Sequence, residues 1–230
     1  MAYFFLPECT AGTTYLPPDE SRHAVKSLRL RSNDAFSVLN GKGDVFNAIL
    51  KDANEKKLSF HIEKVLHVDQ KFPLLNIAIS PLKFNDRLEL FVEKASEMGV
   101  HAITPLICSR TEKKQLNRAR LERVMIAAIK QSGNPYLPIL NEPVDFNTFI
   151  LSDKASSRLI AHCEETQKNR LTEMQFGDKI SVLIGPEGDF SPEETQMAID
   201  SGYIPITLGN NTLRAESAGI TVCAYFHLLK

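Results

Sequence analysis

The sequence predicts an α/β protein that carries a separate β-rich segment at its N-terminal end. Residues up to about 72 contain short strand-like runs separated by turn signals, whereas strands alternate with amphipathic helices from 73 onward. The 230 residues suffice for two domains, and a hydrophobic content of 43% suffices for their cores. We therefore expect one domain over residues 1–72 and a second over residues 73–230.

The N-terminal segment has the rhythm of a small β-barrel. Turn signals at Asn40–Asp44 and Asp52–Asn54 separate its strand-like runs. One helix is expected within it, at Ser21–Leu30. The expected strands are Ala35–Leu39, Val45–Leu50 and Leu58–Val65.

The remaining residues alternate between strands and helices. Leu88, Phe91, Val92 and Ala95 follow helical spacing, and Gly99 ends that helix. A second amphipathic helix carries Leu121, Val124, Met125 and Ala128 and ends near Gly133, and a third, apolar helix covers Ala215–Leu229. The expected strands are Leu74–Ser80, Val100–Ile107, Arg158–His162, Ile180–Ile184 and Ile204–Leu208.

Charge is spread unevenly along a chain whose net charge is only −1. Four cations and His23 lie between Ser21 and Asn33 without an acid, and seven cations against two acids lie between Arg110 and Lys130. Two basic stretches in a neutral chain suit contact with phosphate backbones. Solvated helix faces explain the same composition equally well.

Composition argues against a membrane, a metal and disulfides. The apolar runs are far shorter than a membrane span, and the N-terminus lacks the pattern of an export signal, so we expect a cytoplasmic protein. The four cysteines form no CxxC pair and the histidines form no HExxH. His162, Cys163 and Glu164 are adjacent, but consecutive strand residues point to opposite faces, so we expect no metal site there.

The segment ISVLIGPEGDFSPEE, from Ile180 to Glu194, is the first candidate site. A buried strand runs into Gly185–Gly188, and a helix with a capping box opens at Ser191. Glycines at the carboxyl end of a strand let a ligand approach the backbone where α/β sheets bind ligands. A tight turn before a well-capped helix, without any ligand, is the alternative.

Two further segments are candidates. ITLGNNTLRAESAGI, from Ile206 to Ile220, again leads from a strand through glycine into a polar loop and a helix rich in small residues. Its Arg214 and Glu216 suit either a site or compensation of the helix dipole. Glu93–Val100 is a charged helix end, which alone is more typical of a solvated helix face than of a site.

Taken together and in order, these segments resemble the RsmE family, which methylates N3 of a uridine in 16S ribosomal RNA. The matching pieces cover almost the whole chain, and the GPEG and LR-x-E-x-A motifs are specific as a pair. They are SLRLRSND, EKASEMGVHAITPL, KQSGNPYLP, LIGPEGDFSPEE and LGNNTLRAESA.

The resemblance implies a PUA-like β-barrel followed by a SPOUT methyltransferase domain with a deep trefoil knot. It also implies S-adenosylmethionine as the cofactor, 16S rRNA within the 30S subunit as the partner, and a homodimer. The cofactor loops would be residues 161–164, 183–188 and 208–215. The expected cofactor-binding residues are Ala161, His162, Leu183, Ile184, Gly185, Pro186, Gly188, Leu208, Gly209 and Leu213.

Expected roles also follow for charged residues. Arg214 would stabilise the uridinate, and Glu216 would accept the proton or orient Arg214. The expected rRNA-binding residues are His23, Lys26, Arg29, Arg31 and Arg110. The chain departs from the family in having Asp189 where glycine is usual, and it lacks the arginine that the family often carries near the N-terminus.

Three other functions compete with this one. A SPOUT methyltransferase with another RNA target would share the same motifs. A catalytically silent RNA-binding or ribosome-assembly protein would have degraded cofactor loops, whereas Gly185, Gly188, Gly209 and Arg214 are all present. A small-molecule enzyme would not need two basic stretches.

Overall fold

A computed structural model describes residues 2–71 and 73–229. Contacts divide the chain into two units, and Phe72, at the expected boundary, lies outside the described residues. The first unit comprises Met1–Gln70 with Ile126–Leu137, and the second comprises Lys71–Met125 with Pro138–Lys230.

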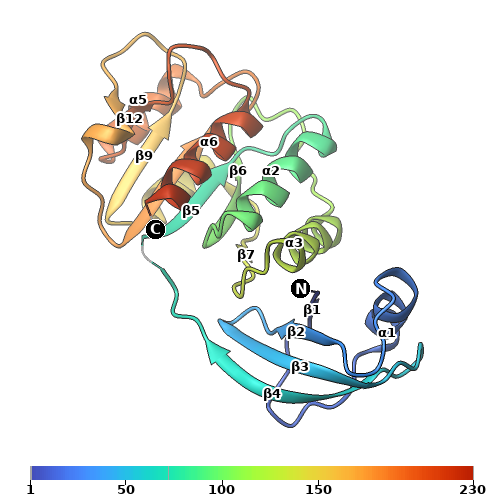
Figure 1. Ribbon diagram of the computed structural model, residues 1–230. Coiled ribbons are helices and arrows are strands. Elements are labelled where there is room, and N and C mark those ends of the chain that lie inside the picture. Colours follow the sequence, from blue (N-terminus) through green and yellow to red (C-terminus); the bar gives the residue numbers. More distant parts are fainter. Residues whose placement is uncertain (1, 72, 230) are drawn as a thin grey trace. The chain divides into compact units, whose positions relative to one another are not determined.

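The first unit is built on a four-stranded sheet with the order β1-β2-β3-β4 (Figure 1). β1 (Tyr3–Phe5) runs parallel to β2 (Ala35–Leu39), while β3 (Asp44–Asp52) and β4 (Ser59–His67) continue the sheet as antiparallel strands. The three expected strands are confirmed, and β1 was not predicted. A bridge between Tyr15 and Ser59 lies at the outer edge of β4. No ladder joins β4 to β1 among the described residues.

Aromatic side chains fill the core of this unit. Phe4, Phe36 and Phe60 are fully buried and meet edge to face, with centroids 5.2 and 5.4 Å apart. These are distances at which aromatic pairs add stability beyond the area that they bury. Tyr3–Phe5, near the N-terminus, is therefore a strand that places Phe4 in the core.

The expected helix at Ser21–Leu30 begins earlier and ends earlier. α1 (Pro18–Arg22) opens with proline at its first position, and a π-helical turn, η1 (His23–Ser27), continues it. Arg29 then adopts a φ of 57°, a left-handed conformation that ends the helix. The segment is nevertheless helical and basic, as the sequence indicated.

The second unit contains an eight-stranded sheet in which every pairing is parallel (Figure 1). Its order is β10-β12-β9-β11-β5-β6-β7, and β8 pairs with β6. The strands are β5 (Leu74–Ile79), β6 (Ala102–Ile107), β7 (Ile139–Leu140), β8 (Val144–Asp145), β9 (Ser157–Ala161), β10 (Asn169–Arg170), β11 (Lys179–Ile184) and β12 (Ile204–Thr207).

Helices cover both faces of this sheet. α2 and α6 pack on one another, and α6 also contacts β5 and β11. A separate core lies on the other face of the sheet. It contains Phe146 of α4, Ala198 of α5 and the strand residues Ile160 and Leu183. Successive strand residues point to opposite faces of a sheet, so both faces carry a core. The helices of this unit are α2 (Asn85–Glu97), α4 (Phe146–Ser152), α5 (Pro192–Asp200) and α6 (Ala215–Leu228), with a short 3-10 turn, η2 (Leu171–Glu173). The remaining helix, α3 (Arg118–Ser132), belongs to the first unit from Ile126 onward.

This architecture confirms the α/β class with a parallel sheet and an N-terminal β-rich part. The strands expected at β5, β6, β9, β11 and β12 and the helices α2, α3 and α6 are all present. Among the described residues, no helix is both long and apolar enough to cross a membrane.

Candidate functional site

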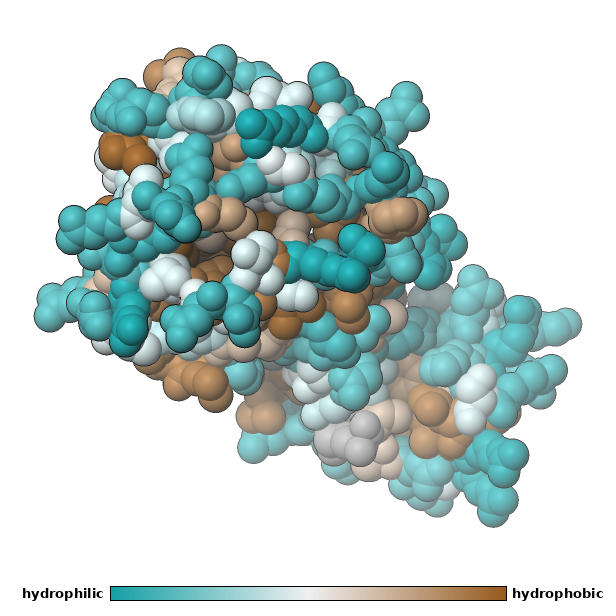
Figure 2. Space-filling model, turned by 90° about the horizontal axis from the view of Figure 1, so that it is seen from above, coloured by the Kyte–Doolittle hydropathy of each residue, from teal (hydrophilic) through white to brown (hydrophobic). Residues whose placement is uncertain are grey.

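The loops that follow β9, β11 and β12 line one cavity of about 510 Å³. These three strands are neighbours and parallel, so their carboxyl ends lie at the same edge of the sheet. The space-filling view in Figure 2 shows a hollow with a hydrophobic floor and a mostly hydrophilic rim. The cavity is lined by Arg87, Ala161, His162, Cys163, Lys168, Ile184, Gly185, Pro186, Glu187, Asp189, Ile206, Thr207, Leu208, Gly209, Asn210, Asn211, Thr212, Leu213, Arg214, Ala215 and Ala218.

The loop after β11 is held in shape by the helix that follows it. The Ser191 hydroxyl accepts a bond from the Glu194 amide, and the Glu194 carboxylate accepts one from the Ser191 amide, which is the predicted capping box. Glu194 also accepts bonds from the backbone amide and hydroxyl of Ser109. A Cβ at Gly185 would lie 3.1 Å from the Phe190 amide, so glycine allows this loop to fold tightly.

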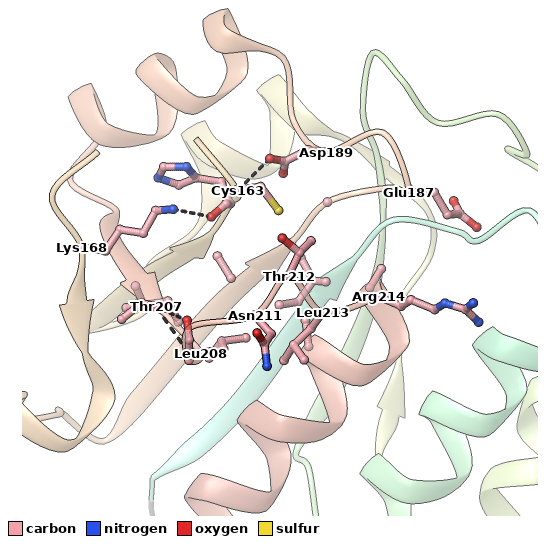
Figure 3. A pocket seen from close by; sticks show the side chains of 18 of the residues that line it. Cys163, Lys168, Glu187, Asp189, Thr207, Leu208, Asn211, Thr212, Leu213 and Arg214 are labelled. Atoms are coloured by element: carbon pink, nitrogen blue, oxygen red, sulfur yellow. Dashed lines mark hydrogen bonds between the residues drawn. The ribbon is translucent and has the colours of Figure 1, made fainter. Parts of the chain in front are cut away.

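Asp189 joins this loop to the loop after β9. Its Oδ2 accepts a 2.7 Å bond from the Cys163 amide (Figure 3). Its Oδ1 accepts a 2.9 Å bond from the Phe190 amide. Its φ of 62° lies in the left-handed region, which aspartate tolerates better than most residues with a side chain. This conformation explains why glycine suits the position, and the carboxylate adds a tie between loops that glycine cannot make.

His162 and Lys168 shape the loop after β9. The Lys168 ammonium donates a 2.8 Å bond to the His162 carbonyl (Figure 3). The His162 side chain is buried, and its two ring nitrogens have no partner among the described residues. Burial, and then the nearby charge of Lys168, lower the pKa of His162 below its ordinary value, so the ring is neutral at pH 7.

The loop after β12 leaves its backbone open to a ligand. Gly209 has a φ of 130°, which residues with a side chain rarely adopt, and a Cβ there would meet nothing within 4 Å. The Thr207 hydroxyl donates a 3.0 Å bond to the Gly209 carbonyl and fixes the turn. Space beside an accessible backbone is what a bound small molecule requires.

Arg214 and Glu216 lie at the start of α6 but occupy different surroundings. Arg214 is exposed, lines the cavity and has no hydrogen bond or salt bridge from its guanidinium to a described residue. Figure 3 shows it extending away from Leu208 on the side of the pocket where Glu187 lies. Glu216 is 5% exposed, and its Oε1 lies 3.8 Å from Nε of Arg87. Glu216 is thus paired with Arg87 rather than with Arg214.

A family model described as an RNA methyltransferase domain matches residues 70–227, and one described as an RNA methyltransferase PUA domain matches residues 16–63. The chain belongs to the RNA methyltransferase family. A ribosomal RNA small subunit methyltransferase E from Rickettsia conorii is 30% identical, with 93% of this chain and 89% of the relative covered. The Synechocystis enzyme of the same name is 28% identical, with 95% of this chain and 74% of the relative covered.

Solved structures agree with the family. The crystal structure of a ribosomal RNA small subunit methyltransferase E from Neisseria gonorrhoeae, bound to S-adenosyl methionine, has a TM-score of 0.89 to this chain. It is 28% identical, and the alignment covers 100% of this chain and 98% of the other. The resemblance to the RsmE family that the sequence motifs indicated is confirmed, and the protein is an RNA methyltransferase.

Most residues expected at the cofactor site of this RNA methyltransferase line the cavity. Leu183 does not, because its side chain is fully buried in the core beneath the sheet edge. Gly188 does not line it either and lies against the side chain of Arg110. Those that line it are Ala161, His162, Ile184, Gly185, Pro186, Leu208, Gly209 and Leu213.

The residues expected to bind RNA fall into two groups. His23, Lys26, Arg29 and Arg31 are all exposed on the segment around η1, where Lys26 pairs with Glu55 at 3.0 Å. Arg110 belongs to the second unit, and its Nη1 donates bonds of 2.7 and 3.1 Å to the carbonyls of Gly188 and Phe190. Arg110 therefore supports the loop after β11 with the same guanidinium that was expected to face RNA.

Arg87 and Lys168 are the charged residues of the cavity that the sequence analysis did not identify. Neither belongs to a glycine motif, and both reach the cavity from segments remote from Arg214 in the chain. No group of three or more His, Cys, Asp or Glu residues in the described part of the chain could hold a metal ion.

Proposed function

We propose that this RNA methyltransferase transfers the methyl group of S-adenosylmethionine to N3 of a uridine in 16S rRNA. The observation that carries the proposal is the single cavity formed by three adjacent strand ends in a chain of this family. The named relatives act on small-subunit ribosomal RNA, and one of them was solved with the same methyl donor.

The residues present fit this donor. The cavity volume of about 510 Å³ lies within the usual range for small-molecule sites. Gly209 keeps the backbone accessible on one side, and the Asp189–Cys163 bond holds the opposite loops together. We assign the donor to Ala161, His162, Ile184, Gly185, Pro186, Leu208, Gly209 and Leu213.

The chemistry left to the protein is alignment and activation of the acceptor. The sulfonium of S-adenosylmethionine supplies an electrophilic methyl group when bound. Holding two reactants in a fixed geometry can contribute roughly 7–11 kcal/mol. Uracil N3 carries a proton at neutral pH and pairs in a duplex, so the protein has to accept an unpaired base and favour its anion.

Arg214 is our candidate for stabilising that anion. Its guanidinium lines the cavity without a partner among the described residues, so it is free to approach an anionic oxygen or nitrogen. Preorganised charge of this kind is worth several kcal/mol in other enzymes. Glu216 does not line the cavity, so we assign it to orienting an arginine, and that arginine is Arg87.

The proposal extends to architecture. The chain passes from β11 beyond β9 to form β12, and α6 then returns to pack on β5 and β11. This crossing supports the proposed deep trefoil knot. We further propose a homodimer in the cytoplasm, with residues 1–72 as the PUA-like β-barrel that binds RNA and residues 73–230 as the SPOUT domain.

We propose that His23, Lys26, Arg29 and Arg31 contact the backbone of rRNA within the 30S subunit. Their exposure on one short segment supports the assignment. Backbone contacts release counterions, so the affinity for RNA is expected to fall steeply with salt. A flat salt response would exclude this role.

One experiment tests the function. The protein is incubated with labelled S-adenosylmethionine and 30S subunits that lack the modification, and the labelled nucleotide is mapped. We expect label at N3 of one uridine, and label in another RNA only would replace the proposed substrate. Arg214→Ala is expected to lower the single-turnover rate by about a hundredfold while calorimetry shows unchanged donor affinity. A near-normal rate removes Arg214 from catalysis.

A further inference from the structure

We propose that Phe84 and Arg87 form a subsite for the nucleotide next to the target base, in which Arg87 binds a phosphate and Phe84 stacks on a base. The inference rests on the proposed function, because it assumes an RNA substrate at the cavity. Phe84 precedes α2 as its N-cap residue, and Arg87 lies in the first turn of that helix.

The Arg87 guanidinium is held from two sides. Its Nε lies 3.8 Å from Oε1 of the buried Glu216, and its central carbon lies 4.9 Å from the centre of the Phe84 ring. Its terminal nitrogens make no hydrogen bond to a described residue. The planar end of an arginine is a paired donor that matches phosphate oxygens. Because Glu216 contacts Nε and Phe84 contacts the face of the guanidinium, the terminal nitrogens of Arg87 are oriented and remain available to bind a phosphate.

Glu216 explains why Arg87 stays in place. Glu216 is 5% exposed, and its second oxygen has no partner among the described residues. A buried carboxylate needs a nearby cation, so the two side chains hold one another across the contact between α2 and α6. In this arrangement Glu216 is a positioning residue, and Arg87 touches the substrate.

Phe84 has the properties of a stacking platform. The residue is 51% exposed although it is a large aromatic, and the Arg87 guanidinium covers its ring. Exposed aromatic rings beside arginine are a common means of binding unpaired bases in RNA.

The subsite adjoins the cavity. The backbone amide of Lys83, next to Phe84, donates a 2.9 Å bond to Oε1 of the cavity residue Glu187. Arg87 itself lines the cavity, and its side chain is 27% exposed. A backbone phosphate of an RNA chain has to remain at such a solvent-accessible edge. The methyl donor, in the proposed function, lies among the three loops. Lys113, whose ammonium donates to Oδ1 of Asn85, adds positive charge nearby.

The test compares Arg87→Met and Phe84→Ala in two assays. The first is binding of a fluorescent oligouridylate at increasing KCl, and the second is single-turnover methylation of unmodified 30S subunits. We expect each substitution to raise the oligouridylate Kd and the half-saturating 30S concentration about tenfold. Arg87→Met should also reduce the slope of log affinity against log salt by about 0.7, while Phe84→Ala leaves that slope unchanged.

Conservative variants separate binding from folding. Phe84→Trp is expected to restore affinity, and Arg87→Lys is expected to keep the salt slope but to bind more weakly. Arg158→Met is the matched control, because Arg158 also lies over an aromatic ring, that of Tyr203 at 5.6 Å, but outside the cavity lining. It should leave both assays at the wild-type level.

The affinity for S-adenosylmethionine, measured by calorimetry, shows which anion Arg87 binds. Unchanged affinity for S-adenosylmethionine in Arg87→Met supports the phosphate, whereas a tenfold loss there with unchanged RNA affinity would assign Arg87 to the donor's carboxylate and overturn the subsite. If Phe84→Ala dissociates a dimer in light scattering without changing RNA affinity, the surface is an interface between copies. Absence of 30S methylation in the wild type refutes the proposed function, while the oligouridylate assay still decides the subsite.

Discussion

Gly219 of α6 packs directly against Phe91 of α2, and replacing it with alanine tests how tightly these helices are packed. A Cβ on Gly219 would lie 2.6 and 2.7 Å from Cε2 and Cδ2 of the Phe91 ring. Phe91 is fully buried, so its ring cannot swing away into solvent. One of the two helices has to shift, or the ring has to leave its preferred rotamer.

Two effects of opposite sign decide the result. Alanine in the middle of a helix is more stable than glycine by roughly 0.5–1 kcal/mol. Overpacking a filled core costs roughly 1–3 kcal/mol. Because the contact is with a fully buried ring, we expect overpacking to prevail, and Gly219→Ala should lower the free energy of unfolding by about 1 kcal/mol.

Urea unfolding followed by circular dichroism measures this difference as a lower midpoint at an unchanged slope. The matched variant is Phe91→Leu, which removes the crowded ring edge. In that background the overpacking cost of Gly219→Ala should disappear and leave the helix gain of roughly 0.5–1 kcal/mol, so the double-mutant cycle should give a coupling of about 1.5–2 kcal/mol. A Gly219→Ala protein that is as stable as the wild type, or more stable, refutes the packing argument and shows that helix propensity decides at this position.

Two further predictions concern the cavity loops. Arg110→Met removes the donor to the carbonyls of Gly188 and Phe190, so calorimetry should show about fivefold weaker donor binding; unchanged affinity would mean that these bonds do not shape the site. His162 has a native pKa below its ordinary value of 6.5, so the unfolded chain binds more protons just below that pH and stability should fall as pH falls through 6.5. The wild-type melting temperature should therefore drop more than that of His162→Gln between about pH 7.5 and about pH 5.5, and equal drops would contradict this.

Long periodic segments were predicted well, and short ones were missed. α2, α3 and α6 each repeat apolar residues over three or more turns, and β11 is mostly apolar. β1, β7, β8 and β10 have two or three residues each, and α4 has seven. A run this short contains too few repeats to show a period, so its conformation depends on the strand or core that it meets.

The candidate site divides in the same way. Gly185 and Gly209 were identified because a glycine after an apolar strand is a local signal, and the capping box at Ser191 was identified from its spacing. Arg87 was missed because nothing around it in the sequence marks it. Arg110 was named only as a candidate for RNA contact, and the sequence did not show that it also donates to the loop carbonyls, a geometry that depends on where the segment after β6 lies beside that loop.

The sequence by itself determined the α/β class, the order of the main elements, the glycine loops and the family, because each of these is written in residues close together in the chain. Only the tertiary structure decided which charges meet. Glu216 pairs with Arg87, 129 positions earlier in the chain, and Asp189 bonds to the Cys163 amide, 26 positions earlier. The physical reason is that the parallel sheet brings strand ends and helix starts that are distant in the sequence to one edge. No local sequence pattern indicates that these segments lie close together.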